Sequence, residues 1–436
     1  MAVPAPHRLR FEAGPLVLAA AVPFLFLHRN YQPSASFGQV DVFLSDLAVL
    51  AVVVAGALAA RKRIAVLART WTSWAGLVAL AALAVLGVAW GAHYAGYPAG
   101  THATTAAKWV EYMLLAPAVM LIVRAPRDLV PAAAVAVGWS FVATAVGILQ
   151  FFGAVSDLDH TPAGSRKSSL LGYHDFSALS AAVLVLALAA LLADVGPRRV
   201  AWAALASGIV GMVIGGAFDA VVGTIGACVV LVLALHVRDA RRLAIVGCAL
   251  ALVIAGTFAI RSQAVADGLK FLGIEHGSGG ASQNVQSYRQ RVLLAYIGGR
   301  IFLAHPATGV GWEGSSDEFA YAPFLSAARR RFSQPPVAFP SPAHPWGVQN
   351  AYVQALADLG VLGLLAFLWA TAWPAVAALR RGLGLTRVVG AALVVLALGV
   401  WNGYGLVAGI PLDALTWLAV GVALASVALA AERFTT

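Results

Sequence analysis

Long apolar runs alternate with short polar segments along almost the whole chain. Twelve runs can be distinguished, and most approach the roughly 20 residues with which an α-helix crosses a bilayer core. They cover residues 13–29, 41–60, 72–92, 109–123, 130–152, 176–194, 200–216, 220–237, 243–260, 350–378, 388–407 and 411–431. The pattern predicts an all-α polytopic membrane protein with about twelve transmembrane helices.

One gap in this pattern is much longer than the others. Residues 261–349 separate the ninth apolar run from the tenth, so residues 1–260 hold nine predicted spans and residues 350–436 hold three. The gap contains a Gly/Ser-rich stretch, Gly277 to Ser282, and Pro-rich chain from Gln334 to Pro345. Because long loops in compact proteins are usually functional, we expect this region to contribute to the site.

Basic residues are concentrated between alternate apolar runs. Seventeen Lys and Arg lie in the termini and short loops of one side, whereas the short loops of the opposite side hold four. Cytoplasmic loops are enriched in Lys and Arg, so both termini are predicted to be cytoplasmic and residues 261–349 to be extracytoplasmic. The net charge of +10 is then explained by topology, and no nucleic acid partner is expected.

Composition agrees with a chain embedded in lipid. Hydrophobic residues make up 61% of the sequence and charged residues 11%, against roughly a quarter charged in soluble domains. The first apolar run ends at His28-Arg29-Asn30 without an Ala-x-Ala site, which predicts an uncleaved helix. Cys228 and Cys248 both lie in apolar runs and provide neither a disulfide framework nor a thiolate metal site.

Within the large loop, the run from Ser287 to Ala304 predicts a short amphipathic helix that a proline ends. Arg289 and Arg300 are eleven residues apart and fall on nearly the same helix face at about 100° per residue, whereas Arg291 points away from them. Arginine suits diphosphate binding because its guanidinium is permanently charged and donates bidentate hydrogen bonds. The alternative is a surface helix whose arginines contact lipid headgroups.

Ionisable residues near the outer ends of the predicted spans suggest a polar cavity. Asp46 lies just inside the second run, His174-Asp175 precedes the sixth, and Asp219 lies between the seventh and eighth. Lys108 and Glu111 are spaced i, i+3 and are expected to pair with each other. Since ionisable residues are rare in spans and often functional, their common side predicts a cavity open to the outside.

The stretch from Arg291 to Phe367 resembles the bacterial O-antigen ligase and O-antigen polymerase superfamily of membrane glycosyltransferases. The family pattern has an arginine upstream of His-Pro, a Gly-x-Gly turn, then His-Asn-x-Tyr/Leu-x-Gln, an acidic residue and Gly-x-x-Gly-Leu. The matching residues are Arg291, His305-Pro306, Gly309-Val-Gly311 and the run from Gln349 to Leu364. Leu171-Gly-Tyr-His-Asp-Phe176 is a second, weaker match.

This resemblance implies a metal-independent enzyme of the plasma (inner) membrane that requires no cofactor. Such enzymes transfer a glycan from a polyprenyl-diphosphate carrier to a sugar, lipid or protein acceptor outside the cytoplasm. The reaction needs cations on the leaving diphosphate and a group that orients the acceptor hydroxyl. Arg291 is predicted for the first role, with substrate contacts from Arg289, Arg300, His174, Asn350 and Tyr352.

Two family positions differ in this sequence. The family histidine is Gln349, which can bind a hydroxyl but cannot take its proton near neutral pH; His344, five residues upstream, is a candidate substitute. The alternative is that Gln349 only caps or packs the start of the tenth span. The family's second arginine is replaced near Phe218-Asp219, where the Asp219 carboxylate is a candidate base or acceptor ligand.

Three other functions remain open from the sequence. A transporter or flippase of lipid-linked glycans would be expected to have two related halves, which are not apparent. A peptidoglycan-type polymerase would need a catalytic aspartate in the large loop, where Asp317 is the candidate. A non-catalytic scaffold derived from the enzyme is the third.

Overall fold

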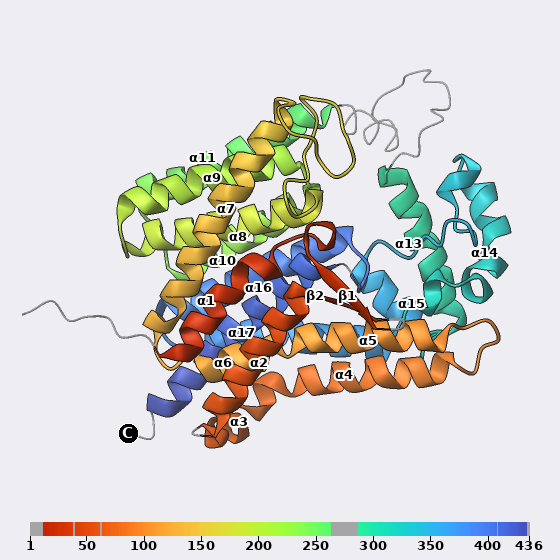
Figure 1. The fold of residues 1–436 in the computed structure, drawn as a ribbon, viewed down its shortest axis with the longest axis horizontal. Coiled ribbons are helices and arrows are strands. Elements are labelled where there is room, and N and C mark those ends of the chain that lie inside the picture. The colour runs from red at the N-terminus through yellow and green to blue at the C-terminus, as the bar shows by residue number, and fades with distance from the viewer. Residues whose placement is uncertain (1–11, 38–39, 62, 263–286, 408, 434–436) are drawn as a thin grey trace, which may run out of the picture.

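The computed structural model describes residues 12–37, 40–61, 63–262, 287–407 and 409–433 (Figure 1). Its α-helices are α1 (Ala13–Leu25), α2 (Leu44–Ala60), α3 (Ile64–Arg69), α4 (Trp71–Gly91), α5 (Ala99–Met113), α6 (Leu115–Ile122), α7 (Val130–Phe151), α8 (Tyr173–Ala193), α9 (Arg198–Gly215), α10 (Phe218–Ala234), α11 (Ala240–Ile260), α13 (Ser287–Ala304), α14 (Glu318–Arg331), α15 (Ala351–Arg381), α16 (Gly384–Val400) and α17 (Ile410–Arg433). Short 3-10 helices are η1 (Arg29–Tyr31), η2 (Pro126–Leu129), η3 (Gly314–Ser316), η4 (Pro336–Ala338) and η5 (Trp401–Gly403).

The fold is that of a multi-pass α-helical membrane protein, as the apolar pattern predicts. Within the described residues, nine helical segments are long and apolar enough to cross a bilayer. They are Trp71–Gly91, Ala99–Ile122, Pro126–Phe151, Tyr173–Ala193, Arg198–Gly215, Ala240–Ile260, Ala351–Arg381, Gly384–Gly403 and Ile410–Arg433. Three shorter apolar helices accompany them: Ala13–Leu25, Leu44–Ala60 and Phe218–Ala234.

A small antiparallel sheet departs from the all-α prediction. Strands β1 (Ser34–Phe37) and β2 (Val40–Phe43) pair with Ser34 opposite Phe43. The second apolar run, expected from residue 41, therefore becomes helical only at Leu44. Asp46 is the reason for this boundary, because its Oδ2 accepts a hydrogen bond from the Phe43 backbone N at 2.8 Å and caps the helix.

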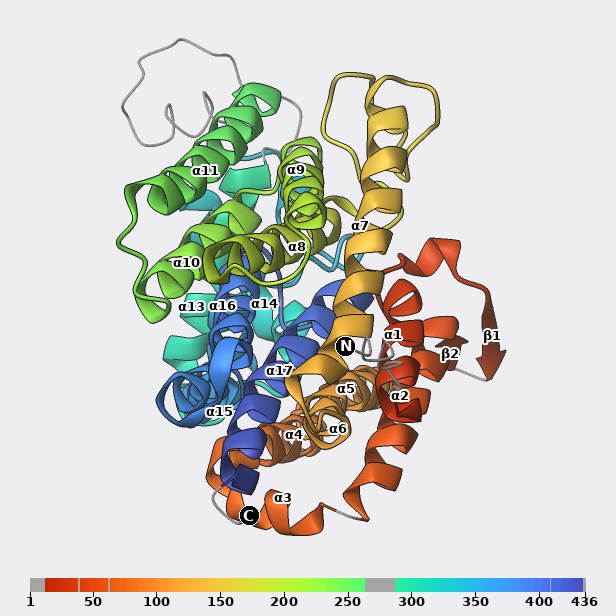
Figure 2. The same cartoon turned by 90° about the vertical axis from the view of Figure 1, so that its left-hand side faces the viewer.

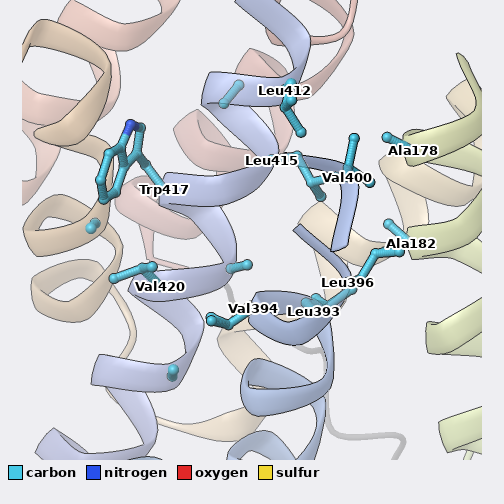
Figure 3. Packing of buried hydrophobic residues seen from close by; sticks show 14 of the residues in the cluster. Ala178, Ala182, Leu393, Val394, Leu396, Val400, Leu412, Leu415, Trp417 and Val420 are labelled. Atoms are coloured by element: carbon cyan, nitrogen blue, oxygen red, sulfur yellow. The ribbon is translucent and has the colours of Figure 1, made fainter. Parts of the chain in front are cut away.

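The core lies where α8, α16 and α17 meet. In both ribbon views, α8 to α11 form one group and α2 to α6 another, with α16 and α17 between them (Figures 1 and 2). Figure 3 shows small side chains of α8, such as Ala178 and Ala182, beside Leu396 of α16 and Leu415 of α17. All four are buried, so α8 packs directly on α16 and α17.

Small residues also set the spacing of α8 and α9. A Cβ atom at Gly211 would lie 2.2 Å from Ser180 Oγ, and one at Gly215 would lie 2.3 Å from Ser177 Oγ. Helices in a bilayer associate largely through such close packing, because lipid provides no hydrophobic driving force between them. This contact positions the N-terminal end of α8, where His174 and Asp175 lie.

The large loop contains two long α-helices in its described part. The helix predicted from Ser287 to Ala304 is present as α13, whereas α14 was not predicted. Glu318 in its first turn and three arginines in its last turn complement the helix dipole. Leu293 and Ile297 of α13 share a buried cluster with Tyr321 of α14, Phe339 and Ala357 of α15. The Gly/Ser stretch from 277 to 282 lies outside the described residues.

The two glycine motifs of the family pattern pack against each other. Helix α15 is interrupted at Gly360, whose φ of 68° and ψ of −164° open its hydrogen-bond ladder. The incoming chain fills the opening: Gly311 N donates to Asp358 O at 2.9 Å and Val361 N donates to Pro306 O at 2.9 Å. A Cβ at Gly360 would lie 2.3 Å from Ala307 O. The break in α15 therefore holds the segment from Pro306 to Gly311, which follows α13, against this helix.

The basic segment around Arg63 and the helices of the large loop lie at different ends of the helix bundle. Arg63, beside α3, donates to both carboxylate oxygens of Glu432 at 2.8 Å and to the carbonyls of Met120, Leu121 and Val123. These contacts gather the ends of α6 and α17 around α3. Figure 1 shows α3 and the C-terminal end of α17 at the lower left and α13 and α14 at the right.

Candidate active site

Arg291 in the second turn of α13 joins the N-terminal ends of two other helices. Its Nε donates to Gln349 Oε1 at 3.1 Å, and its Nη2 lies 3.0 Å from His174 Nε2. Gln349 directly precedes Asn350, the N-cap of α15, and His174 is the second residue of α8. Three segments that are distant in sequence therefore meet at one guanidinium.

The same histidine contacts Asp219 in the first turn of α10. His174 Nδ1 lies 2.8 Å from Asp219 Oδ2. A guanidinium nitrogen can only donate, so His174 Nε2 must accept from Arg291 and Nδ1 must carry the proton donated to Asp219. Asp219, His174, Arg291 and Gln349 thus form one hydrogen-bonded chain with a defined histidine tautomer.

Close packing holds the Asp219–His174 pair in place. Asp219 is 7% exposed, and a Cβ at Gly403 of η5 would lie 2.2 Å from its Oδ2. The Tyr404 ring meets the imidazole of His174 edge to face, with centroids 5.0 Å apart. A larger residue at 403 would displace the Asp219 carboxylate, so the turn after α16 helps to hold Asp219 in position.

Two further arginines, which the sequence predictions did not assign to the site, flank this chain. Arg261 at the end of α11 donates from Nη1 to Gly216 O at 3.2 Å, and its guanidinium lies 4.8 Å from the centroid of the Phe218 ring. Arg166 lies over the Tyr173 ring at 4.2 Å. Gly216, with a φ of 62°, separates them, since a Cβ there would lie 3.4 Å from both side chains.

The arginines produce an excess of positive charge. The pKa of Arg261 is lowered to about 10, first by burial and then by the neighbouring charges of Arg166 and Arg291, while Asp219 opposes the shift. Burial and Arg291 likewise lower the pKa of Arg166. Arg261 is still charged at neutral pH, so three guanidinium groups face one buried carboxylate. We call Arg166, Arg261, Arg291, His174, Asp219 and Gln349 the arginine site; its charge balance favours a multiply charged anion.

The loop between α7 and α8 contains Arg166, and contacts of the neighbouring Lys167 hold this loop in place. Lys167 is 2% exposed; its Nζ donates to the carbonyls of Thr161 at 2.7 Å and Pro162 at 2.8 Å and lies 3.6 Å from Asp157 Oδ2. Its backbone N donates to Ile214 O of α9 at 2.9 Å. Lys167 therefore holds the loop in place, whereas Arg166 belongs to the arginine site. The sequence pattern used both residues only as charges that indicate topology.

The other predicted site residues lie elsewhere. His344 is exposed and stacks on Trp346, with ring centroids 6.0 Å apart. Asn350 caps α15 by accepting from Val353 N at 3.0 Å, and the Tyr352 hydroxyl donates to Leu398 O at 2.5 Å. Arg300 is exposed, 5.9 Å from the Phe324 ring. These contacts serve to position α13 to α16.

Arg289 is half-buried on α13, two residues before Arg291. Two acidic residues weighed in the sequence analysis contact side chains outside the arginine site. Lys108 pairs with Asp46 of α2 at 2.5 Å, so the expected Lys108–Glu111 pair is wrong; the packing of α2 on α5 supplies a closer carboxylate. Asp317 Oδ2 lies 2.8 Å from His102 Nε2 of α5, and Glu313 Oε2 lies 3.7 Å from His102 Nδ1. Both contacts tie the large loop to α5.

Comparison with known proteins does not assign this chain to a family. No model of a known protein family matches the chain, and no curated protein matches it significantly. Across the described ranges, no group of three or more His, Cys, Asp or Glu side chains is arranged to hold a metal ion. The fold is that of a multi-pass helical membrane protein, and its arginine site contains three guanidinium groups.

Proposed function

We propose that this protein is a membrane glycosyltransferase, a ligase or polymerase that uses a polyprenyl-diphosphate-linked glycan as donor. The observation that carries the proposal is the convergence of Arg166, Arg261 and Arg291 on the buried Asp219–His174 pair. The resemblance of residues 291–367 to the O-antigen ligase and polymerase superfamily supports the same chemistry. The acceptor is a glycan, lipid or protein group at the outer face of the plasma membrane.

The proposed topology has twelve spans. The nine long segments and the three shorter apolar helices α1, α2 and α10 together correspond to the twelve apolar runs. Both termini and the basic end around Arg63 are cytoplasmic in this proposal, while α13, α14 and the arginine site are extracytoplasmic. The separation of α3 from α13 and α14 across the bundle supports this orientation (Figure 1).

The arginines would stabilise the leaving group. The acceptor oxygen attacks the anomeric carbon of the donor as the bond from that carbon to the diphosphate oxygen breaks. The bonding electrons leave with the diphosphate, and its growing charge is met by the guanidinium groups that bind it. Stacking of Arg166 on Tyr173 and of Arg261 on Phe218 limits the reorientation that the site must undergo when the diphosphate leaves.

His174 is the proposed base. In the described state its Nε2 lone pair accepts from Arg291, and diphosphate binding would draw that guanidinium onto phosphate oxygens. Nε2 would then be free to take the proton of the acceptor hydroxyl, while Asp219 stabilises the imidazolium that forms. The imidazole that the family has at the start of the tenth span would here come from α8, and Gln349 would orient Arg291 through its amide oxygen.

Release of polyprenyl diphosphate tests the proposal. The full-length protein in lipid nanodiscs would be given a mixture of polyprenyl-diphosphate glycans, and wild type compared with Arg291→Ala and Arg300→Ala, two arginines of the same helix. We expect release to fall about a hundredfold or more with Arg291→Ala and to be unchanged with Arg300→Ala. Glycan that crosses vesicle membranes without any diphosphate release would instead identify a transporter.

A further inference from the structure

A polar cavity lies beside the arginine site, at the first turn of α8. Its volume is about 470 Å³, and it lies between the N-terminal ends of α2, α8 and α17 and one face of α5. Its ionisable lining residues are His28, Arg29, Asp46, Lys108, Tyr112, Asp175 and Asp413. We call it the acidic cavity. Its size is in the range of small-molecule sites, roughly 300–1,000 Å³.

Two carboxylates in this cavity have hydrogen-bonding capacity that the protein does not use. Asp175 and Asp413 are each 6% exposed, and within the described part of the chain the Oδ1 atom of each has no hydrogen-bond partner. The two carboxyls are close enough to interact electrostatically. Buried acceptors are normally satisfied, so the pair is suited to accept hydrogen bonds from a bound molecule.

The cations that line the cavity are either paired or exposed at its edge. Lys108 and Asp46 neutralise each other through their 2.5 Å contact, and Arg29 is exposed at the edge. Asp175 and Asp413 therefore provide the unsatisfied polar atoms of the interior, and their oxygens are suited to hydrogen bonds from hydroxyl groups. The arginine site differs because it contains several cations, and the two sites are neighbours because His174 and Asp175 are consecutive residues.

An apolar groove adjoins the cavity. Its volume is about 550 Å³, it shares Asp46, Thr104 and Lys108 with the cavity, and it is otherwise lined mainly by apolar residues of α2 and α5. Leu47 and Leu50, on this face of α2, are 53% and 55% exposed, as is usual for side chains in contact with lipid tails. A molecule with a polar head and an apolar tail would fit both spaces across the Lys108–Asp46 pair.

We infer that the acidic cavity binds the uncharged, hydroxylated head group of a lipid-anchored acceptor, whose tail lies in the adjoining groove. This inference rests on the proposed glycosyltransferase function and names its acceptor class. Tyr404 links the two sites, because it packs on His174 and also interacts with Asp175. A head group in the cavity is thus separated from the proposed base by one side chain.

Binding of hexyl β-D-glucoside to the full-length protein in lipid nanodiscs tests this inference. Wild type would be compared with the double variant Asp175→Ala/Asp413→Ala and with Asp194→Ala. Asp194 is exposed at the opposite end of α8, where it pairs with Arg198. We expect the double variant to bind the glucoside about tenfold more weakly, as for loss of hydrogen bonds to two buried carboxyl oxygens, and Asp194→Ala to bind as wild type does.

Farnesyl diphosphate serves as the second probe, since it should bind at the arginine site. Equal farnesyl diphosphate affinity in wild type and double variant would show that the variant is folded and that only the acidic cavity is changed. Equal glucoside affinity in the two proteins would overturn the inference and leave the proposed function standing. Displacement of the glucoside by hexylammonium but not by a second alkyl glycoside would also overturn it, in favour of a cation site. Failure of farnesyl diphosphate to bind wild type would count against the proposed function itself.

Discussion

The guanidinium of Arg291 donates to the imidazole of His174, Nη2 to Nε2, across 3.0 Å. An arginine normally seeks an anion, so a neutral nitrogen as its partner leaves its charge available for a ligand. The same contact occupies the lone pair that a general base would use. Binding of an anion by Arg291 and activation of His174 are therefore coupled through one hydrogen bond.

This coupling predicts the effect of His174→Gln. Glutamine can replace the hydrogen bonds of the imidazole but cannot take a proton, so kcat for polyprenyl diphosphate release should fall by about 10²- to 10⁴-fold. Farnesyl diphosphate affinity should change little, because the arginines remain. Turnover at the wild-type rate would exclude His174 as the base.

Gln349→Glu should weaken anion binding. A carboxylate in place of the amide oxygen would form an ion pair with Arg291, which the diphosphate would have to displace. A charge-assisted hydrogen bond is worth about 1.5–3 kcal/mol, so we expect farnesyl diphosphate to bind tenfold or more weakly, measured by titration. Gln349→Ala is the control: it loses the orienting contact without adding charge and should have a smaller effect on affinity.

Arg261 should give anion binding a dependence on alkaline pH. Its pKa is lowered to about 10, first by burial and then by Arg166 and Arg291. A bound anion favours the charged form, so affinity should be complete well below pH 10 and should fall as the pH rises through that value. In Arg261→Gln the affinity should be lower at neutral pH and this alkaline decrease should be smaller. An identical pH profile in wild type and variant would contradict the assignment.

The break in α15 should be sensitive to a single methyl group. Gly360 and Gly384 both have positive φ values, 68° and 56°, but a Cβ at Gly360 would lie 2.3 Å from Ala307 O, whereas Gly384 has open space around it. Gly384→Ala measures the strain of a positive φ in open space, about 1–2 kcal/mol, whereas Gly360 also has a ψ of −164°, a combination nearly restricted to glycine. Gly360→Ala should lower the thermal unfolding midpoint several times more, since the chain at 306–311 must also move. Equal midpoints would mean that this packing contributes nothing.

Asp358 should also be required for the folded large loop. Its Oδ1 accepts from Ser315 N at 2.9 Å, and its Oδ2 accepts from Glu313 N at 3.1 Å and from Gln354 Nε2 at 2.9 Å. Asp358→Ala would leave these buried donors unsatisfied, at about 1–3 kcal/mol each. Limited proteolysis of the segment between α13 and α14 should therefore be faster in this variant than in Glu318→Ala, whose side chain lies outside the contact.

The course of the helices follows from local properties of the chain. Apolar length predicts the membrane-spanning segments, and the proline after His305 predicts the end of α13, because both signals act within one helix. Helix α14 was missed because three arginines at its end suggest a solvated patch, although they also complement a helix C-terminus. The start of α2 moved to Leu44 because the cap at Asp46 competes with the apolar pattern.

The chemistry of the site was only partly predictable. Arg291, Gln349 and Asp219 were named from a family motif and its departures, and His174 from its place before a span. Arg166 and Arg261 carry no local signal that separates them from charges that determine topology. Lys108 shows the same limit. The sequence suggests Glu111, one turn away on the same helix, as its partner, but Asp46 of α2 forms the ion pair.

The sequence by itself determined the number and course of the apolar segments, because transfer into lipid depends on the composition of each segment separately. Tertiary structure alone decided which polar ends meet. His174 and Arg291 are joined only after α8 has packed on α9 through Gly211 and Gly215 and after α13 has packed on α15. Contact between distant residues depends on the packing of whole helices, and no spacing in the chain encodes it.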